Sequence, residues 1–145
     1  MATELERLES IKRFADLEGL FSDDSKHHRY SIAADAAGMR VGATNPRAVS
    51  WCLWGGAYKC GLIEDEILSI RASINEMVGH DSIPTFSDSM NTDAADLRKV
   101  IRNACIMHNG PQPEYTLPMP MWLRITLTIV ITIACLAASF YILFG

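Results

Sequence analysis

The sequence predicts a small, mainly helical domain followed by a single transmembrane helix. Apolar residues recur every three or four positions in several segments before residue 110. Near the C-terminus, twenty residues without a charge run from Ile125 to Phe144, enough for a helix to span about 30 Å of hydrocarbon. We therefore expect a soluble domain over residues 1–110, a proline-rich spacer over 111–120 and a transmembrane helix over 121–145.

The soluble domain is expected to be a bundle of about four helices with a short extended or β arm. The segments with helical periodicity are 4–18, 46–60, 63–78 and 92–109. Between the first two, short runs around 29–33 and 39–41, joined by a turn near Gly38, predict the arm. Residues 80–91 are expected to form a loop anchored by Ile83 and Phe86.

The segment 46–60 is expected to be the central helix. The pair Asn45 and Pro46 predicts its start, because an asparagine side chain caps unpaired amides and proline has no amide to leave unpaired. So little of its surface is polar that its tryptophans should help to fill the core. The paired glycines Gly55 and Gly56 weaken a helix, which indicates the close approach of another backbone.

Charge and cysteine content exclude several classes of function. The formal net charge is −4, so a nucleic-acid partner is not expected. The N-terminal stretch has no continuous apolar core of the kind found in a secretion signal, which indicates free thiols in a reducing compartment. No phosphate loop, dinucleotide fingerprint, serine elbow or paired-histidine metal motif occurs, so we expect no cofactor and no metal.

The predicted transmembrane helix is expected to leave the domain in the cytoplasm, because Arg124 is the one basic residue close to the span. Small or weakly polar residues fall at spacings of four, three and four along it. Such a stripe favours self-association in the membrane, although hydroxyls can also bond to carbonyls of their own helix. The stripe consists of Thr128, Thr132, Cys135 and Ser139.

Five residues of the soluble domain are candidates for binding. They are Trp51, Cys52, Asp88, His28 and Arg47. His28 belongs to a basic and aromatic cluster that could contact a partner or anionic headgroups, or simply be solvated. Asp88 could cap the last soluble helix or orient Arg47. Cys52 lies among tryptophans and no motif supplies the base that a nucleophilic thiol needs.

Two blocks of the sequence are RYSIAADAAGMRVGATNPRAVSWCLWGGA and IPTFSDSMNTDAADLRKVIRNA. They resemble an uncharacterised bacterial and phage family, domain of unknown function 6197. The residues that match the family pattern in the first block are Thr44, Pro46, Ala48, Trp51, Cys52 and Gly55. In the second block Asp88 matches, whereas Phe86 and Ser87 replace the usual tryptophan and asparagine. The resemblance implies a compact, mainly helical domain and no known activity.

These observations favour a non-enzymatic, membrane-tethered interaction module of bacterial or phage origin. Its partners would be the membrane, an unidentified protein and, through the transmembrane stripe, further copies of itself. A phage membrane-perturbing protein of the holin or exclusion type is one alternative. A small hydrolase or metal-dependent enzyme that uses Cys52, Cys105, His108 or Asp88 is the other.

Overall fold

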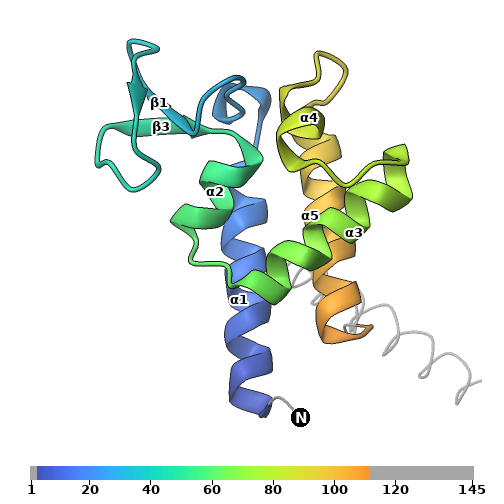
Figure 1. Cartoon of the computed structure of the whole chain (residues 1–145). Helices are drawn as coiled ribbons and strands as arrows, with labels where there is room; N and C mark the ends of the chain where they lie inside the picture. Colours follow the sequence, from blue (N-terminus) through green and yellow to red (C-terminus); the bar gives the residue numbers. More distant parts are fainter. Residues whose placement is uncertain (1–2, 112–145) are drawn as a thin grey trace, which may run out of the picture. The chain divides into compact units, whose positions relative to one another are not determined.

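Five α-helices and a small three-stranded sheet form the part of the chain that the computed structural model describes, residues 3–111 (Figure 1). The mainly helical class is therefore confirmed. The helices are α1 (Glu4–Leu20), α2 (Leu53–Lys59), α3 (Glu64–Val78), α4 (Ile83–Asp88) and α5 (Ala94–Asn109). The strands are β1 (Ala33–Asp35), β2 (Arg40–Val41) and β3 (Ala48–Trp51), and a short 3-10 helix covers Asp24–Lys26.

The predicted spacer and transmembrane helix lie outside the described residues, and so does the stripe from Thr128 to Ser139. Within residues 3–111, no helix is both long enough and apolar enough to cross a bilayer.

The core lies where α5 packs against α1 and α3 (Figure 1). Its largest side chains are almost completely shielded from solvent, and they come from all three helices, from α2 and from the chain after α1. They are Phe14, Leu17, Phe21, Leu53, Ile70, Ile74, Leu97 and Ile101. Burying each such side chain contributes about 1.5–3 kcal/mol, so this cluster supplies most of the driving force for folding.

A buried ion pair fastens α1 to α3. The Glu66 side chain is fully shielded from solvent, and its carboxylate accepts hydrogen bonds from Arg13 Nη2 at 2.7 Å and from the Ile63 amide at 2.9 Å. Burial raises the pKa of Glu66, but hydrogen bonds from Arg13, Ser10 and the Ile63 amide outweigh it and hold this pKa below its usual value. The pair therefore stays ionised and fixes how the two helices meet.

The predicted arm between α1 and α2 is confirmed as two short antiparallel strands with a turn at Gly38, where φ is +77°. Its first strand lies at Ala33–Asp35, later than the run expected around 29–33. Ala33 of β1 faces Val41 of β2. The Asp35 carboxylate accepts the amides of Ala37 and Met39 and so stabilises the turn.

The predicted helix 46–60 is wrong in its first half. The Asn45 side chain accepts the Arg47 amide within a turn, and the following residues form β3, antiparallel to β1 in a sheet of order β2-β1-β3. α2 then begins at Leu53, with Cys52 as its N-cap. The cause is tertiary: residues 48–51 form backbone hydrogen bonds with β1, and a helix at these residues could not form them.

The expected loop 80–91 contains the short helix α4. The Ser82 hydroxyl accepts the Thr85 amide at 3.3 Å, and Pro84 lies in the first turn, where no amide is needed. Ile83 and Phe86 are buried, so their predicted role as anchors is confirmed. The last helix begins later than predicted, because Asp93 caps it by accepting the Asp96 amide at 2.8 Å.

Gly55 and Gly56 both meet neighbours, but of different kinds. A Cβ at Gly55 would lie 2.0 Å from the Ile32 carbonyl oxygen, which confirms the expected close approach of a backbone. At Gly56 the nearest atoms are side-chain atoms of Leu17 and Phe21. At Gly55, α2 therefore packs on the backbone just before β1, and at Gly56 it packs on side chains of the core.

Replacing Gly55 with alanine should destabilise the protein, because the backbone of Ile32 cannot move away without disturbing β1. We expect the free energy of unfolding to fall by about 1–3 kcal/mol in urea titration. Gly19→Ala is the matched control, since a Cβ there meets nothing within 4 Å and lies inside α1, where alanine is favoured by about 1 kcal/mol. Equal stability of the two variants would contradict the packing at Gly55.

Candidate functional site: a cleft beside Trp54

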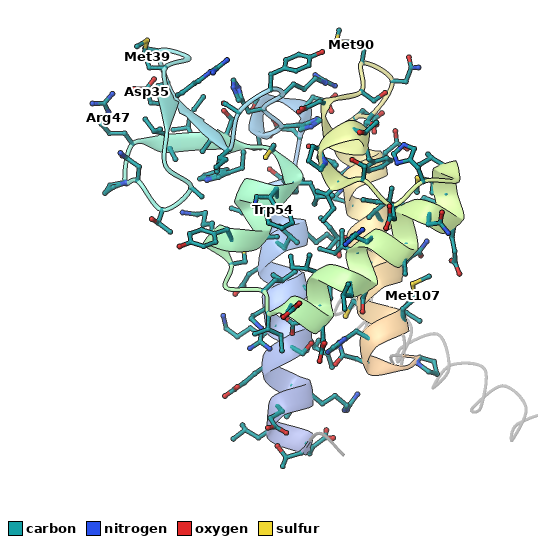
Figure 2. The ribbon with its side chains drawn as sticks, in the orientation of Figure 1. Asp35, Met39, Arg47, Trp54, Met90 and Met107 are labelled. Carbon is teal, nitrogen blue, oxygen red and sulfur yellow. The ribbon has the colours of Figure 1, made fainter. Side chains whose placement is uncertain are left out.

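The main candidate site is a shallow cleft where α2 faces α4. Figure 2 labels Trp54 at this position. The cleft has a volume of about 190 Å³, and most of its exposed lining is apolar. We call it the Trp54 cleft, lined by Tyr30, Ser31, Ile32, Cys52, Trp54, Ile83, Pro84, Ser87 and Asp88.

A second hollow of about 260 Å³ adjoins the Trp54 cleft. The two share Trp54, Ile83 and Pro84 as walls, and the second adds Arg71, Asp81 and Ser82. Arg71 and Asp81 form an ion pair there, so this hollow has no net charge.

Tyr30 has an unusual backbone conformation at the rim of the cleft. Its φ is +65°, a left-handed value that a bulky side chain disfavours by about 1–2 kcal/mol. The Asp88 carboxylate accepts the Tyr30 amide at 2.8 Å and thereby helps to hold this conformation. Asp88 therefore positions an aromatic side chain, and both roles predicted for it are wrong, because Asp93 caps α5 and Arg47 pairs with Asp35.

His27 and Ser87 form the polar layer under the cleft. The Ser87 carbonyl oxygen lies 2.8 Å from His27 Nε2, and because a carbonyl only accepts, Nε2 carries the proton. The Ser87 hydroxyl accepts the Leu53 amide at 3.0 Å, at the start of α2. His27 Nδ1 is buried and has no hydrogen-bond partner among the described residues. Burial and the nearby Arg29 charge lower the pKa of His27, although Ser87, Asp24 and Asp88 oppose this.

Two further residues of the predicted basic and aromatic cluster are bound to the fold, His28 through its backbone and Arg29 through its side chain. The His28 amide donates to the Trp51 carbonyl oxygen at 2.9 Å. The Arg29 guanidinium donates to the carbonyl oxygens of Ser89 at 3.2 Å and Thr92 at 2.6 Å. His28 and Arg29 therefore attach the chain after α1 to β3 and to the loop between α4 and α5.

The chemistry of Cys52 is that of a neutral thiol. Its sulfur accepts the Gly55 amide at 3.3 Å. Burial raises the pKa of Cys52, and the Asp88 charge adds to this, while amides of the first turn of α2 oppose it. Burial also raises the pKa of Cys105 and takes that of Cys60 to about 11. Since the thiolate is the nucleophile and the metal ligand, none of the three is prepared for either role at neutral pH.

Metal ligands do not cluster in the described part of the chain: no three side chains among its histidines, cysteines, aspartates and glutamates come together to hold an ion. His108 instead makes a hydrogen bond of 3.3 Å with the Ser69 hydroxyl.

The structure brings two of the five predicted binding residues together, Cys52 and Asp88, in the Trp54 cleft. Trp51 is buried: its indole nitrogen donates to the Ala43 carbonyl oxygen at 2.9 Å, and the Lys59 ammonium lies 4.9 Å from its ring centre. Arg47 lies beside Asp35 at the turn end of the sheet, away from Trp54 (Figure 2).

The residues of the cleft that sequence reasoning missed are Ile32 and Trp54, whereas Tyr30 belongs to the predicted basic and aromatic cluster. A signal for Trp54 was present, because Trp54 and Tyr58 are four residues apart on a helix whose other residues, apart from Lys59, are small or apolar. No local pattern marks Ile32, since its place depends on contacts with Cys52 and Gly55 at the start of α2.

Protonation of His27 should destabilise the fold. Below about pH 6.5 the unfolded chain binds a proton that the folded chain, with its lowered pKa, does not. The free energy of unfolding should therefore fall as the pH drops through this value, as measured by urea titration at several pH values. In His27→Gln, whose amide group can still donate to the Ser87 carbonyl, this loss should be smaller. Identical pH dependence of the two proteins would contradict the role of His27.

Compared with protein-family models, with curated proteins and with solved structures, the chain gives no significant match in any of the three. The resemblance to domain of unknown function 6197 therefore stays a prediction.

Proposed function

We propose that this chain is a membrane-tethered, non-enzymatic interaction module of bacterial or phage origin. Its domain lies on the cytoplasmic face and binds a protein partner at the Trp54 cleft. The observation that supports this most directly is the set of large apolar side chains held open to solvent around a concave surface.

The exposure of these side chains is what a binding site requires. Tyr30 is 63% exposed, Ile32 50% and Trp54 47%, although all three border the same cleft. Tryptophan and tyrosine are the residues that most often dominate binding energy at protein interfaces. Covering them would remove apolar surface from water, at about 25 cal/mol per Å².

The polar groups of the cleft suit positioning better than catalysis. The Cys52 thiol is protonated, and among the described residues its hydrogen bond is with the Gly55 amide and not with an imidazole. The His27 ring is bound to Ser87, and Asp88 holds Tyr30. A hydrolase would need a nucleophile within hydrogen-bond reach of its base. Turnover of a substrate that is lost in Cys52→Ala or Asp88→Asn would instead favour the enzyme.

The membrane part of the proposal depends on the sequence. The uncharged run from Ile125 to Phe144 has the length of a bilayer's hydrocarbon core, and the proline-rich residues 111–120 provide a spacer. The alternative of a membrane-perturbing protein depends on the stripe within that run. Depolarisation of cells that express the full chain, abolished by changing Thr132 and Ser139 to leucine, would favour that alternative.

Replacing Trp54 with alanine should abolish partner binding. A photoreactive residue in place of Ile32, in the full chain in its native membranes, should give a protein adduct that disappears in Trp54→Ala. Tyr58→Ala is the matched control, because Tyr58 is 69% exposed, lies one turn along α2 and does not line the cleft. Thermal unfolding checks that both variants are folded. An adduct that survives Trp54→Ala, or no adduct at all, would show that the cleft is not the binding site.

The full chain should stay with the membrane pellet after extraction at alkaline pH, because a transmembrane helix is not held by charge alone. A chain that ends at Pro111 should appear in the supernatant. Protease added to the periplasmic side of spheroplasts should leave the domain intact. Release of the full chain by alkaline extraction, or digestion of the domain from outside, would contradict the predicted anchor or its orientation.

A further inference from the structure

We propose that the Trp54 cleft binds a proline-rich segment of the partner protein in the polyproline II conformation, with a basic side chain beside the prolines that pairs with Asp88. This inference rests on the proposed function and names the chemistry of its partner.

The shape and composition of the surface favour prolines. Trp54, Ile83 and Pro84 line both of two adjacent shallow hollows. Flat aromatic and proline surfaces of this kind are what polyproline II segments contact in recognition domains, where successive turns enter successive hollows. With three residues per turn and 3.1 Å per residue, one turn of such a segment advances about 9 Å.

The backbone groups of the cleft disfavour a partner that adds a β-strand. The Tyr30 amide is bound to Asp88, and the Ile32 carbonyl oxygen accepts the Cys52 amide at 3.2 Å. The Leu53 and Gly55 amides are bound to Ser87 Oγ and Cys52 Sγ. A strand would need free donors and acceptors here.

A polyproline II segment does not need the backbone hydrogen bonds that a β-strand would need, because its prolines have no amide hydrogen and its conformation has no internal hydrogen bonds. Its carbonyl oxygens need donors only. The Trp54 indole nitrogen is a donor, and the Tyr30 hydroxyl can donate as well. Both side chains are largely exposed at the cleft and make no hydrogen bond to another described residue, so they can donate to a bound peptide.

The charge of the cleft selects a basic flanking residue. Asp88 is the one charged residue among those that line it, and no described basic side chain forms an ion pair with it. Arg29, which directly precedes Tyr30, donates to the backbone carbonyls of Ser89 and Thr92. A lysine or arginine of the partner would complement this carboxylate, whereas an anionic lipid headgroup would be repelled.

The test is binding of synthetic peptides to the purified full chain in detergent, followed by fluorescence anisotropy. The probe contains Pro-Pro-Leu-Pro-Pro-Arg, and two control peptides replace either its prolines with alanine or its arginine with glutamate. We expect the probe to bind, and both controls to bind at least about tenfold more weakly. Trp54→Ala should weaken binding of the probe peptide by a similar factor, and Tyr58→Ala should leave its binding unchanged.

Asp88→Asn isolates the charge, because an asparagine oxygen can still accept the Tyr30 amide. In this variant the preference for arginine over glutamate in the peptide should disappear. Equal binding of the proline and alanine peptides, or an unchanged arginine preference in Asp88→Asn, would overturn the proposal.

The photo-adduct at Ile32 distinguishes this failure from failure of the proposed function. If the adduct depends on Trp54 but excess probe peptide does not compete with it, the cleft binds a protein and the proline-rich chemistry is wrong. If no Trp54-dependent adduct forms, the proposed function itself fails. If the probe peptide prevents formation of the adduct and the alanine peptide does not, the result supports both the proposed function and the proline-rich chemistry of the partner.

Discussion

The structure depends on one set of polar contacts between two segments about sixty residues apart, 24–30 and 87–94. Side chains of the first segment bind mainly backbone groups of the second. In one contact the roles are reversed, because the Asp88 side chain accepts a backbone amide of the first segment. The pairs are Asp24 with the Ala94 amide, His27 with the Ser87 carbonyl, Arg29 with the Ser89 and Thr92 carbonyls, and the Tyr30 amide with Asp88. These bonds attach the sheet and α2 to α4 and α5.

The same contacts solve a local problem at the junction of α4 and α5. Four amides at the start of a helix and four carbonyls at its end have no partner within that helix. At this junction Asp24 accepts the amide of Ala94, the first residue of α5, and His27 donates to the Ser87 carbonyl in the last turn of α4. Leaving one such buried group unpaired costs about 1–3 kcal/mol. Local capping and long-range attachment are thus served by the same residues.

The Trp54 cleft is a consequence of this attachment. Part of its lining comes from Tyr30, at the end of the first segment, and from Ile32 just after it. Ile83 and Pro84 of α4 also line it. Gly55 lets α2 approach the Ile32 backbone so closely that a Cβ would not fit.

The sequence by itself determined the long helices, because periodicity, caps and terminal glycines are local. α1, α3 and α5 lie where their stripes of apolar residues predict, and Gly79 ends α3 with a left-handed φ of +79°. The sequence also carries the uncharged run from Ile125 to Phe144 that predicts the anchor. Only the tertiary structure decided what becomes of residues 46–52. They have helical starting signals and yet form a turn, then β3 at Ala48–Trp51, because β1 pairs with the backbone there. It also decided which tryptophan is buried: Trp51 on β3 lies in the core, and Trp54 on α2 is exposed to solvent. The reason is that side chains on one face recur every two residues in a strand and about every 3.6 residues in a helix.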